Sequence, residues 1–265
     1  MSAPAKPPDM ILYFDIGNTH THVGLGTASK ILKQKNLPTS AWFDHSILPA
    51  VKQFAGKSKI DHCALASVVP RATSVARAIL SAQFSPPFEL RHDTVTGIGI
   101  AYPKPETIGP DRLANAVAAK HLLGAPSVVV DFGTAVTFDI LDRRGNYVGG
   151  IIAPGLAVMT SYLHEKTALL PQITIRDTNS IIGKNTKQAM LIGAVHGYRG
   201  LIRELLAALK KELDSPTLPV IATGGYAKLM ASKLPEITLV QPLLTLDGLR
   251  LCWNAAQSGN KKATP

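Results

Sequence analysis

Short apolar runs that end in a polar, glycine-containing turn organise this chain. One run at 12–14 (Leu-Tyr-Phe) is followed by Asp-Ile-Gly-Asn-Thr at 15–19. A second run at 128–130 (Val-Val-Val) is followed by Asp-Phe-Gly-Thr-Ala at 131–135. Each run predicts a buried β-strand that delivers an aspartate to a tight turn. Asp-x-Gly is common between strands, but its repetition with the same apolar approach predicts two related halves.

The residues after each turn continue the β pattern. Residues 21–25 and 136–141 predict a second strand in each half. A third apolar run, 218–222, leads into Thr-Gly-Gly at 223–225. Because open α/β sheets bind ligands where strands end at glycines, this third turn is also expected to face a ligand.

The remaining elements differ between the halves. In the first half the pattern predicts a hairpin, a helix, a strand at 64–68, a helix at 73–84 and further strands. In the second half it predicts a strand at 147–153, a long helix, the strand before Gly224 and a closing helix.

A helix at 110–123 is expected to connect the halves. Pro110 suits its first turn, and Gly-Ala-Pro at 124–126 is a stop signal. Asp111 lies in that first turn, where the positive end of the helix dipole favours an ionised carboxylate of low pKa. It could serve as a proton acceptor, or it could merely cap the helix while Arg112 pairs with a neighbour.

The repeated turn has the chemistry of a phosphate site. Glycine lets backbone N–H groups approach an anion, aspartate suits a hard cation such as Mg²⁺, and threonine adds a hydroxyl. Two such turns could clamp a nucleotide polyphosphate. His20 and His22 would share a strand face, so a metal site there is conceivable, although no further ligand has suitable spacing.

Composition excludes several classes of protein. With 265 residues and 46% hydrophobic content, the chain can bury a large core in one or two α/β domains. Residues 1–8 lack the apolar core of a secretory signal, and the uncharged stretch 145–164 is interrupted by glycine and proline, so no membrane span is predicted. Cys63 and Cys252 form no metal or disulfide pattern, which suits a cytoplasmic protein with reduced thiols.

The net charge of +10 raises the question of nucleic acid. The basic residues are scattered, and aromatic residues make up only 6% of the chain, so no nucleic-acid binding is predicted. A general positive field would instead help to attract an anionic substrate such as ATP.

Taken in order, the motifs resemble those of the type III pantothenate kinases, within the acetate and sugar kinase, Hsp70 and actin superfamily. The matching segments lie at 15–19, 67–70 (Ser-Val-Val-Pro), 102–103, 109–112 (Gly-Pro-Asp-Arg), 131–135, 149–155, 183–186 (Gly-Lys-Asn-Thr), 223–225 and 246–249 (Leu-Asp-Gly-Leu). The resemblance implies an α/β fold of two ribonuclease-H-like (actin-like ATPase) domains, each with a mixed central sheet flanked by helices. We place them at 10–110 and 111–254, with flexible tails at 1–9 and 255–265.

The resemblance also implies an active site in the cleft between the domains. ATP, with Mg²⁺, would bind Asp15, Ile16, Gly17, Asn18, Thr19, His20, Thr21, His22 and Thr134. Asp131 would hold a monovalent cation, K⁺ or NH₄⁺, and Asp111 would be the general base. Pantothenate would contact Tyr102, Gly109, Pro110, Asp111, Arg112 and Thr186.

A homodimer is expected, with the active site near the subunit interface. The resemblance implies that Thr186 reaches the substrate of the second subunit, although its hydroxyl could instead cap the helix predicted from about 187 to 213. Small residues in that helix, Gly193, Ala194, Gly197 and Gly200, would permit close approach of another helix.

Two positions depart from the family pattern. His22 stands where relatives often have a basic residue, and a histidine supplies positive charge only when protonated. Pro110 replaces a small residue but fits the first turn of a helix.

The predicted function is ATP-dependent phosphorylation of pantothenate to 4'-phosphopantothenate, the first step of coenzyme A biosynthesis. One alternative is a transcriptional accessory factor of the same family, which would not need Asp15, Asp111, Asp131 and Thr186 together. Another is a different superfamily activity, such as an acetate or sugar kinase or an actin-like filament. The chain is short for an actin-like filament protein. The motifs at 109–112 and 183–186 match pantothenate kinases and so argue against a sugar kinase.

Overall fold

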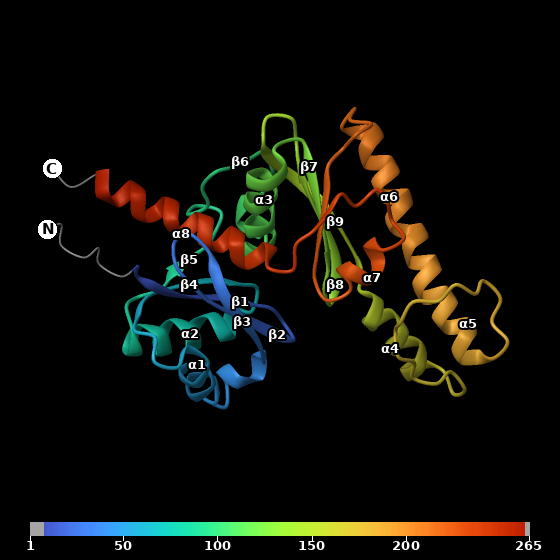
Figure 1. Ribbon diagram of the computed structural model, residues 1–265, viewed down its shortest axis with the longest axis horizontal. Helices are drawn as coiled ribbons and strands as arrows, with labels where there is room; N and C mark the ends of the chain where they lie inside the picture. Colours follow the sequence, from blue (N-terminus) through green and yellow to red (C-terminus); the bar gives the residue numbers. More distant parts are fainter. Residues whose placement is uncertain (1–7, 263–265) are drawn as a thin grey trace, which may run out of the picture. The chain divides into compact units, whose positions relative to one another are not determined.

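The computed structural model describes residues 8–262, which fall into two compact units. Residues 8–118 and 243–262 form unit 1, and residues 119–242 form unit 2. Each unit contains one β-sheet with helices packed against it (Figure 1).

Unit 1 is built on a five-stranded sheet in the order β3-β2-β1-β4-β5. Strands β1, β2 and β3 are antiparallel neighbours, whereas β4 runs parallel to β1 and β5 parallel to β4. Its elements are β1 (Met10–Ile16), β2 (His20–Gly26), β3 (Ile31–Pro38), η1 (Thr39–Trp42), α1 (Ile47–Ala55), β4 (Ile60–Ser67), α2 (Pro70–Gln83), β5 (Phe88–Glu89), β6 (Gly99–Ile100), η2 (Pro105–Thr107), α3 (Pro110–Leu123, which continues into unit 2) and α8 (Leu244–Lys262).

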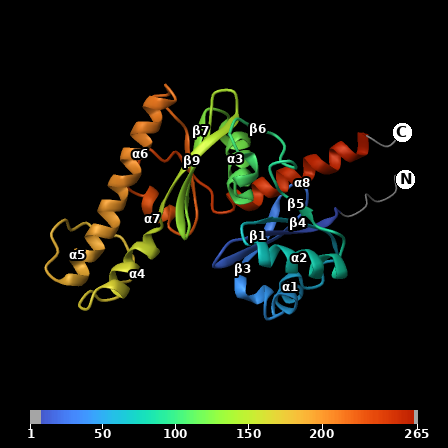
Figure 2. The same ribbon diagram turned by 180° about the vertical axis from the view of Figure 1, so that it is seen from behind.

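Both faces of this sheet are buried, which explains the continuous apolar character of β1. Leu12, Phe14 and Ile16 alternate along one face and pack in a core with residues of η1, α1 and α2. Tyr13 and its cross-strand partner Gly24 lie on the other face, where Leu246 of α8 approaches Gly24. Figures 1 and 2 both show α1 and α2 on one side of the strands and α8 on the other.

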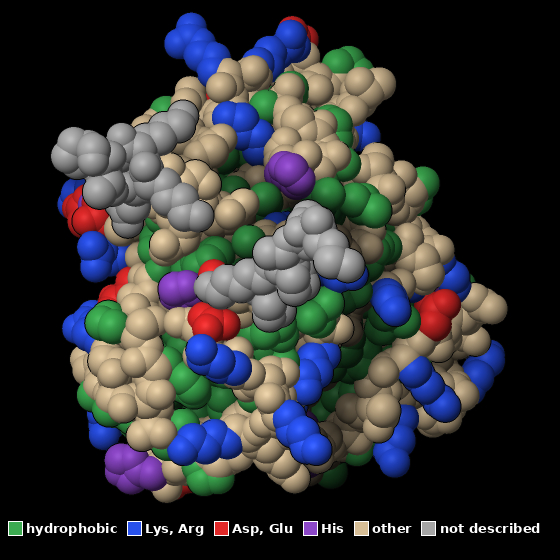
Figure 3. All heavy atoms as spheres, turned by 60° about the vertical axis from the view of Figure 1, so that its left-hand side comes forward, with side chains coloured by type: hydrophobic (Ala, Val, Ile, Leu, Met, Phe, Trp, Pro, Cys, Tyr) green, Lys and Arg blue, Asp and Glu red, His purple; other side chains and the backbone are tan. Residues whose placement is uncertain are grey.

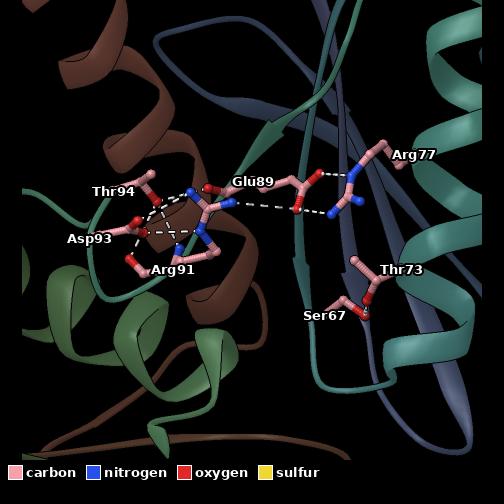
Figure 4. Close-up of polar contacts among 7 residues, drawn as sticks. All are labelled: Ser67, Thr73, Arg77, Glu89, Arg91, Asp93 and Thr94. Atoms are coloured by element: carbon pink, nitrogen blue, oxygen red, sulfur yellow. Dashed lines mark hydrogen bonds and ion pairs between the residues drawn. The ribbon is translucent and has the colours of Figure 1, made fainter. Parts of the chain in front are cut away.

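The edge strand β5 is attached to α2 by an ion pair. Arg77 donates from Nη2 to Oε2 of Glu89 at 2.9 Å, and Arg91 continues the network to Asp93 (Figure 4). The hydrogen bond from Arg77 lowers the pKa of Glu89, so this carboxylate is charged over the physiological range.

Unit 2 repeats the same strand plan. Its strands follow the order β11-β10-β7-β8-β9, with β7, β8 and β9 antiparallel and β10 and β11 parallel additions beside β7. The elements are β7 (Ser127–Phe132), β8 (Ala135–Leu141), β9 (Asn146–Pro154), α4 (Leu156–Lys166), α5 (Thr186–Ile192), the π-helical segment η3 (Gly193–Gly197), α6 (Tyr198–Glu212), β10 (Val220–Thr223), α7 (Ala227–Ala231) and β11 (Leu239–Val240). The repeated turn in the sequence therefore reflects a repeated fold.

Most predicted elements are confirmed. The helix predicted at 110–123 is α3, and it ends at Gly124, whose φ of +77° is the left-handed conformation of a helix C-terminus. The helix predicted from 187 to 213 is present but passes through η3. Strand β3 and helix α4 were not singled out by the sequence pattern, since β3 is largely exposed and α4 buries few residues.

The domain division differs from the predicted one at its ends. Helix α8 packs with unit 1 although it follows unit 2 in the chain, and residues 255–262 continue this helix. Helix α8 packs on β1 and β4, and the flexible tail at 255–265 stays a prediction. The tail predicted at 1–9 lies outside the described residues except for Pro8 and Asp9.

Residues 145–164 fold as β9 and most of α4. Within residues 8–262, no helix combines the length and the apolar content needed to cross a bilayer.

Candidate active site

The first loop, residues 15–22, spans the end of β1, a tight turn and the start of β2. Ile16 pairs with Thr21, so residues 17–20 form the turn, which is closed by a 3.0 Å bond from Gly17 N–H to the His20 carbonyl. Asn18, Thr19 and His20 are exposed at its tip. The loop therefore presents backbone and side-chain groups to solvent, as a phosphate site requires.

Thr21 was expected to bind ATP, but the structure turns its side chain into the protein. Its side chain is fully buried, and its hydroxyl accepts a 3.0 Å hydrogen bond from the indole Nε1 of Trp42. It lies 3.2 Å from the Thr39 hydroxyl, which in turn donates to the Gly17 carbonyl at 2.7 Å. Thr21 thus supports the loop from beneath, and its hydroxyl does not face solvent.

Asp15 and His22 lie opposite each other on β1 and β2. Side chains of such a pair share one face of the sheet, which is compatible with both facing a nucleotide. His22 Nδ1 is 2.8 Å from Oδ1 of Asn36 on β3, which fixes the ring orientation. Within the described residues, no group of three or more His, Cys, Asp or Glu side chains could hold a metal ion, so the conceivable histidine metal site is absent there.

Asp111 begins helix α3 directly after Gly109 and Pro110. Its Oδ1 accepts a 2.8 Å hydrogen bond from the N–H of Arg112. Burial nevertheless raises the pKa of Asp111 above the ordinary aspartate value, and the Arg112 N–H and guanidinium oppose that rise only in part. The predicted low pKa of Asp111 is therefore wrong. Loss of hydration raises the pKa of this carboxyl more than its position in the first turn of the helix lowers it.

Gly109 makes room for that carboxylate. A Cβ at this position would lie 2.4 Å from Oδ1 of Asp111 and 3.3 Å from Cγ1 of Val68. Only glycine leaves this space, so the Gly-x-Asp-Arg motif has a steric reason.

The Ser-Val-Val-Pro motif at 67–70 connects Asp111 to the first loop. Val68 donates its N–H to the Ile16 carbonyl at 3.1 Å, and its side chain lies against Gly109. Ser67, paired with Ile16 across the sheet, accepts a 2.7 Å hydrogen bond from Thr73 of α2 (Figure 4). The first loop and the candidate base are therefore both held by the end of strand β4 in unit 1.

Helix α8 supports helix α3 from the opposite end of the chain. A Cβ on Gly248 would fall 1.9 Å from the Ala114 carbonyl oxygen, so α8 touches the backbone of α3 there. Thr245 also donates to Oδ1 of the buried Asn115 at 2.8 Å. This contact explains the Leu-Asp-Gly-Leu motif, and the sequence pattern alone had assigned it no role.

Tyr102 follows β6 and is 37% exposed. It belongs to unit 1, as do Gly109, Pro110 and Arg112. Pro110 occupies the first residue of α3, where a proline needs no N–H partner, so the departure from the family pattern leaves the helix start intact.

The second loop, residues 131–135, occupies the equivalent place in unit 2. A Cβ on Gly224, which has φ +89°, would lie 2.6 Å from Oδ1 of Asp131. A Cβ on Gly155 would lie 2.1 Å from the Thr134 carbonyl oxygen. The structure thus brings the Asp131 loop and the Thr-Gly-Gly turn together.

Thr186 is the first residue of α5 and is exposed. The helix is capped by Asn185, whose side chain accepts a 3.0 Å hydrogen bond from Gln188 N–H. Capping therefore does not explain Thr186, and its hydroxyl is compatible with a ligand role.

Basic side chains are spread over the surface. Figure 3 shows Lys and Arg side chains distributed over one face and not collected in a single stripe. This distribution agrees with the scattered pattern of basic residues in the sequence.

Comparison with known proteins gives a consistent result. A model of the type III pantothenate kinase family matches residues 11–208. The type III pantothenate kinase of Akkermansia muciniphila is 44% identical over 240 residues, covering 91% of this chain and 96% of its own. That of Methylacidiphilum infernorum is 39% identical over 261 residues, covering 96% of this chain and 92% of its own.

Solved structures share the fold at lower identity. A Campylobacter jejuni protein assigned to the Baf family of transcriptional activators has a TM-score of 0.56 at 20% identity, covering 94% of this chain and 99% of its own. A Listeria monocytogenes protein assigned as an N-acetylmannosamine kinase has a TM-score of 0.51 at 15% identity, covering 95% of this chain and all of its own (100%). These likenesses confirm the predicted actin-like ATPase fold.

Proposed function

Because the chain belongs to the type III pantothenate kinase family, we propose how its residues divide the phosphorylation of pantothenate by ATP. The reaction moves the γ-phosphoryl group of ATP to the primary hydroxyl of pantothenate and gives ADP and 4'-phosphopantothenate. This activity stands at the start of coenzyme A biosynthesis, and the relatives favour it over a transcriptional accessory role.

The nucleotide is assigned to the two loops. The exposed tip of the first loop (Asn18, Thr19 and His20) offers N–H groups and side chains to phosphate oxygens. Asp15 and His22 lie on one face beside that tip, and Thr134 contributes from the second loop. Ile16 and Gly17 give the loop its buried anchor and its turn.

The cation site is assigned to Asp131. One carboxylate lies here among glycines and strand-end carbonyls, and the described residues contain no cluster of three acidic or histidine ligands. Such a sparse oxygen site fits a weakly held monovalent cation, K⁺ or NH₄⁺, better than a protein cage for a divalent ion. Mg²⁺ would therefore be held mainly by the ATP phosphates, and its charge would neutralise them.

The single observation that carries the mechanism is the environment of Asp111. Burial raises the pKa of Asp111, and a carboxylate with a raised pKa is a stronger proton acceptor than an exposed aspartate. It accepts the hydroxyl proton of pantothenate as the bond to phosphorus forms, late in a loose transition state. Gly109, Pro110, Arg112 and Tyr102 are assigned to hold pantothenate beside it.

A homodimer is proposed from unit 2. Large apolar side chains are exposed on β9, on α4 and on the segment that leads to Thr186, and the latter includes Leu169 at 90% exposure. They are Ile152, Val158, Tyr162, Leu163, Leu169, Ile181 and Ile182. Exposed apolar residues of this kind mark protein contacts, and a second copy of the chain would bring Thr186 to the partner's substrate. We also propose a cytoplasmic location, where ATP and pantothenate are available.

The decisive experiment measures ATP-dependent phosphorylation of pantothenate by the purified protein with Mg²⁺. It compares K⁺ with Na⁺, and the wild type with Asp111→Asn. Product that requires K⁺ and Asp111 supports the activity and both assignments. Equal product formation by Asp111→Asn would refute the assignment of Asp111 as the base. Equal product formation in Na⁺ would refute the requirement for K⁺.

A further inference from the structure

A buried chain of hydrogen bonds ends beneath the first loop. Trp42 Nε1–H can only donate, and it donates to the Thr21 hydroxyl at 3.0 Å. The Gly17 carbonyl can only accept, and it accepts from the Thr39 hydroxyl at 2.7 Å. The single hydroxyl proton of Thr39 is already donated to Gly17. In the 3.2 Å hydrogen bond between the two hydroxyls, Thr21 is therefore the donor and Thr39 the acceptor. The bonds therefore run in one direction, from Trp42 through Thr21 and Thr39 to Gly17.

This chain of hydrogen bonds from Trp42 to Gly17, called the relay below, lies in the protein interior. Thr21 and Trp42 are fully buried and Thr39 is 2% exposed. The Trp42 ring is held in place by an edge contact with Phe14, at 5.7 Å between centroids. In such a setting, aligned hydrogen bonds polarise one another and hold one geometry.

Thr39 donates two hydrogen bonds to the first loop. Besides the hydroxyl bond to Gly17, its N–H donates to the Thr19 carbonyl at 3.1 Å. In a trans peptide the C=O and the following N–H point in opposite directions. With the Gly17 carbonyl turned inward, the N–H of Asn18 is turned outward, toward the exposed tip.

We propose that Thr39 and Trp42 are positioning residues for the nucleotide, which orient and polarise the Gly17–Asn18 peptide so that the Asn18 N–H binds a phosphate oxygen of ATP. Polarisation of the carbonyl makes the N–H of the same peptide a better donor to an anion. Neither residue contacts ATP itself, and both lie outside the motif that forms the loop. The inference rests on the proposed function only in taking ATP as the ligand.

The test compares Thr39→Val, which keeps the shape and removes the hydroxyl, with Thr39→Ser, which restores it. In Thr39→Val, the Kd for ATP, measured by equilibrium dialysis without pantothenate, should rise about tenfold. The KM for ATP should rise with it, whereas the KM for pantothenate stays within about twofold. The amide nitrogen resonance of Asn18 should shift in Thr39→Val and return in Thr39→Ser.

Tyr13→Phe is the matched control. Its hydroxyl is also buried in this sheet and donates to the Thr27 carbonyl at 3.1 Å, beyond the opposite end of β2. It should lower the melting temperature without changing ATP affinity. If Thr39→Val lowers stability like Tyr13→Phe but binds ATP within about twofold of the wild type, the proposal is overturned.

Trp42→Phe covers the case in which Thr39→Val does not fold. It removes the first donor and keeps an aromatic ring, so a rise of about threefold in the Kd for ATP is expected, and no rise overturns the relay. Failure of the proposed function would look different. A wild type that binds ATP, loses affinity in Thr39→Val and yet does not phosphorylate pantothenate would leave the relay standing and refute the substrate.

Discussion

The two halves of the molecule hold the same loop by different means. In each half a strand ends in proline, and the next residue donates its N–H to a carbonyl of the neighbouring loop at 3.1 Å: Thr39 to Thr19 in unit 1, and Gly155 to Thr134 in unit 2. The first turn spans residues 17–20 and leaves room for the Thr39 side chain. The second spans 133–135 and lies so close that Gly155 has no room for one.

One extra residue in the turn therefore changes the kind of support. The longer loop is held from beneath by hydroxyl groups, which can orient a peptide that meets an anion. The shorter loop is held by direct backbone contact, which fixes the Asp131 carboxylate beside Gly224. This contrast agrees with the division of work proposed above, with phosphate at the first loop and the cation at the second.

The aspartates that follow each half sharpen the comparison. Asp111 lies in the first turn of α3, after the strands of unit 1, and Asp247 lies in the first turn of α8, after the strands of unit 2. Asp247 is paired with Arg250 at 3.2 Å, whereas burial raises the pKa of Asp111. Related positions thus carry one ion-paired carboxylate and one buried carboxylate, and the proposed mechanism makes the buried one the base.

The largest effect is expected from exchanging these carboxylates for amides. Asp111→Asn should reduce kcat roughly 10²–10⁴-fold, because the proton acceptor is gone. Asp247→Asn should keep kcat within about twofold but lose roughly 2 kcal/mol of unfolding free energy with its ion pair. Equal loss of activity in both variants would contradict the separation of roles.

The same pair tests the sign of the pKa shift. The folded-state pKa of Asp111 is raised, so stability falls as pH rises through the unfolded and then the folded pKa, and the penalty is complete above both. Asp111→Asn should therefore melt no lower than the wild type at neutral pH. In the wild type, the acidic limb of kcat/KM should lie above the ordinary aspartate pKa, which a pH–rate profile measures.

Close contact at the second loop predicts the next effect. Gly155→Ala places a Cβ against two backbone carbonyls, so the loop must move. A loss of about 1–3 kcal/mol of unfolding free energy and roughly 10²-fold in kcat/KM for ATP is expected. Stability and activity equal to those of the wild type would mean that the contact under Thr134 does not matter.

Gly224→Ala probes the cation more narrowly. Its φ of +89° disfavours alanine, and the new Cβ would displace the Asp131 carboxylate. The K⁺ concentration for half-maximal activity should rise about tenfold, while saturating K⁺ restores part of kcat. Unchanged activation by K⁺ in this variant would mean that the cation does not bind at Asp131.

Sequence patterns predicted what depends on local periodicity and repeated motifs. The two Asp-x-Gly turns and helix α3 with its stop at Gly124 were predicted in this way. The Thr39 relay was not, because Thr39 and Trp42 contact the loop only after β3 has folded beside β2. The raised pKa of Asp111 was missed for the same reason, since burial is set by tertiary packing and the helix start is local.

The smallest effect concerns the helix of small residues. A Cβ on Gly200 of α6 would meet nothing within 4 Å in the single chain, so Gly200→Ala should raise the unfolding free energy of the monomer by about 0.5–1 kcal/mol. If a second copy packs on this face through its glycines, the same methyl group weakens the dimer, and the dissociation constant should rise about tenfold. Sedimentation equilibrium and thermal melting of one variant then report both effects, which have opposite signs. A higher melting temperature with unchanged dimer affinity would move the subunit contact from Gly200 to the exposed apolar residues around α4.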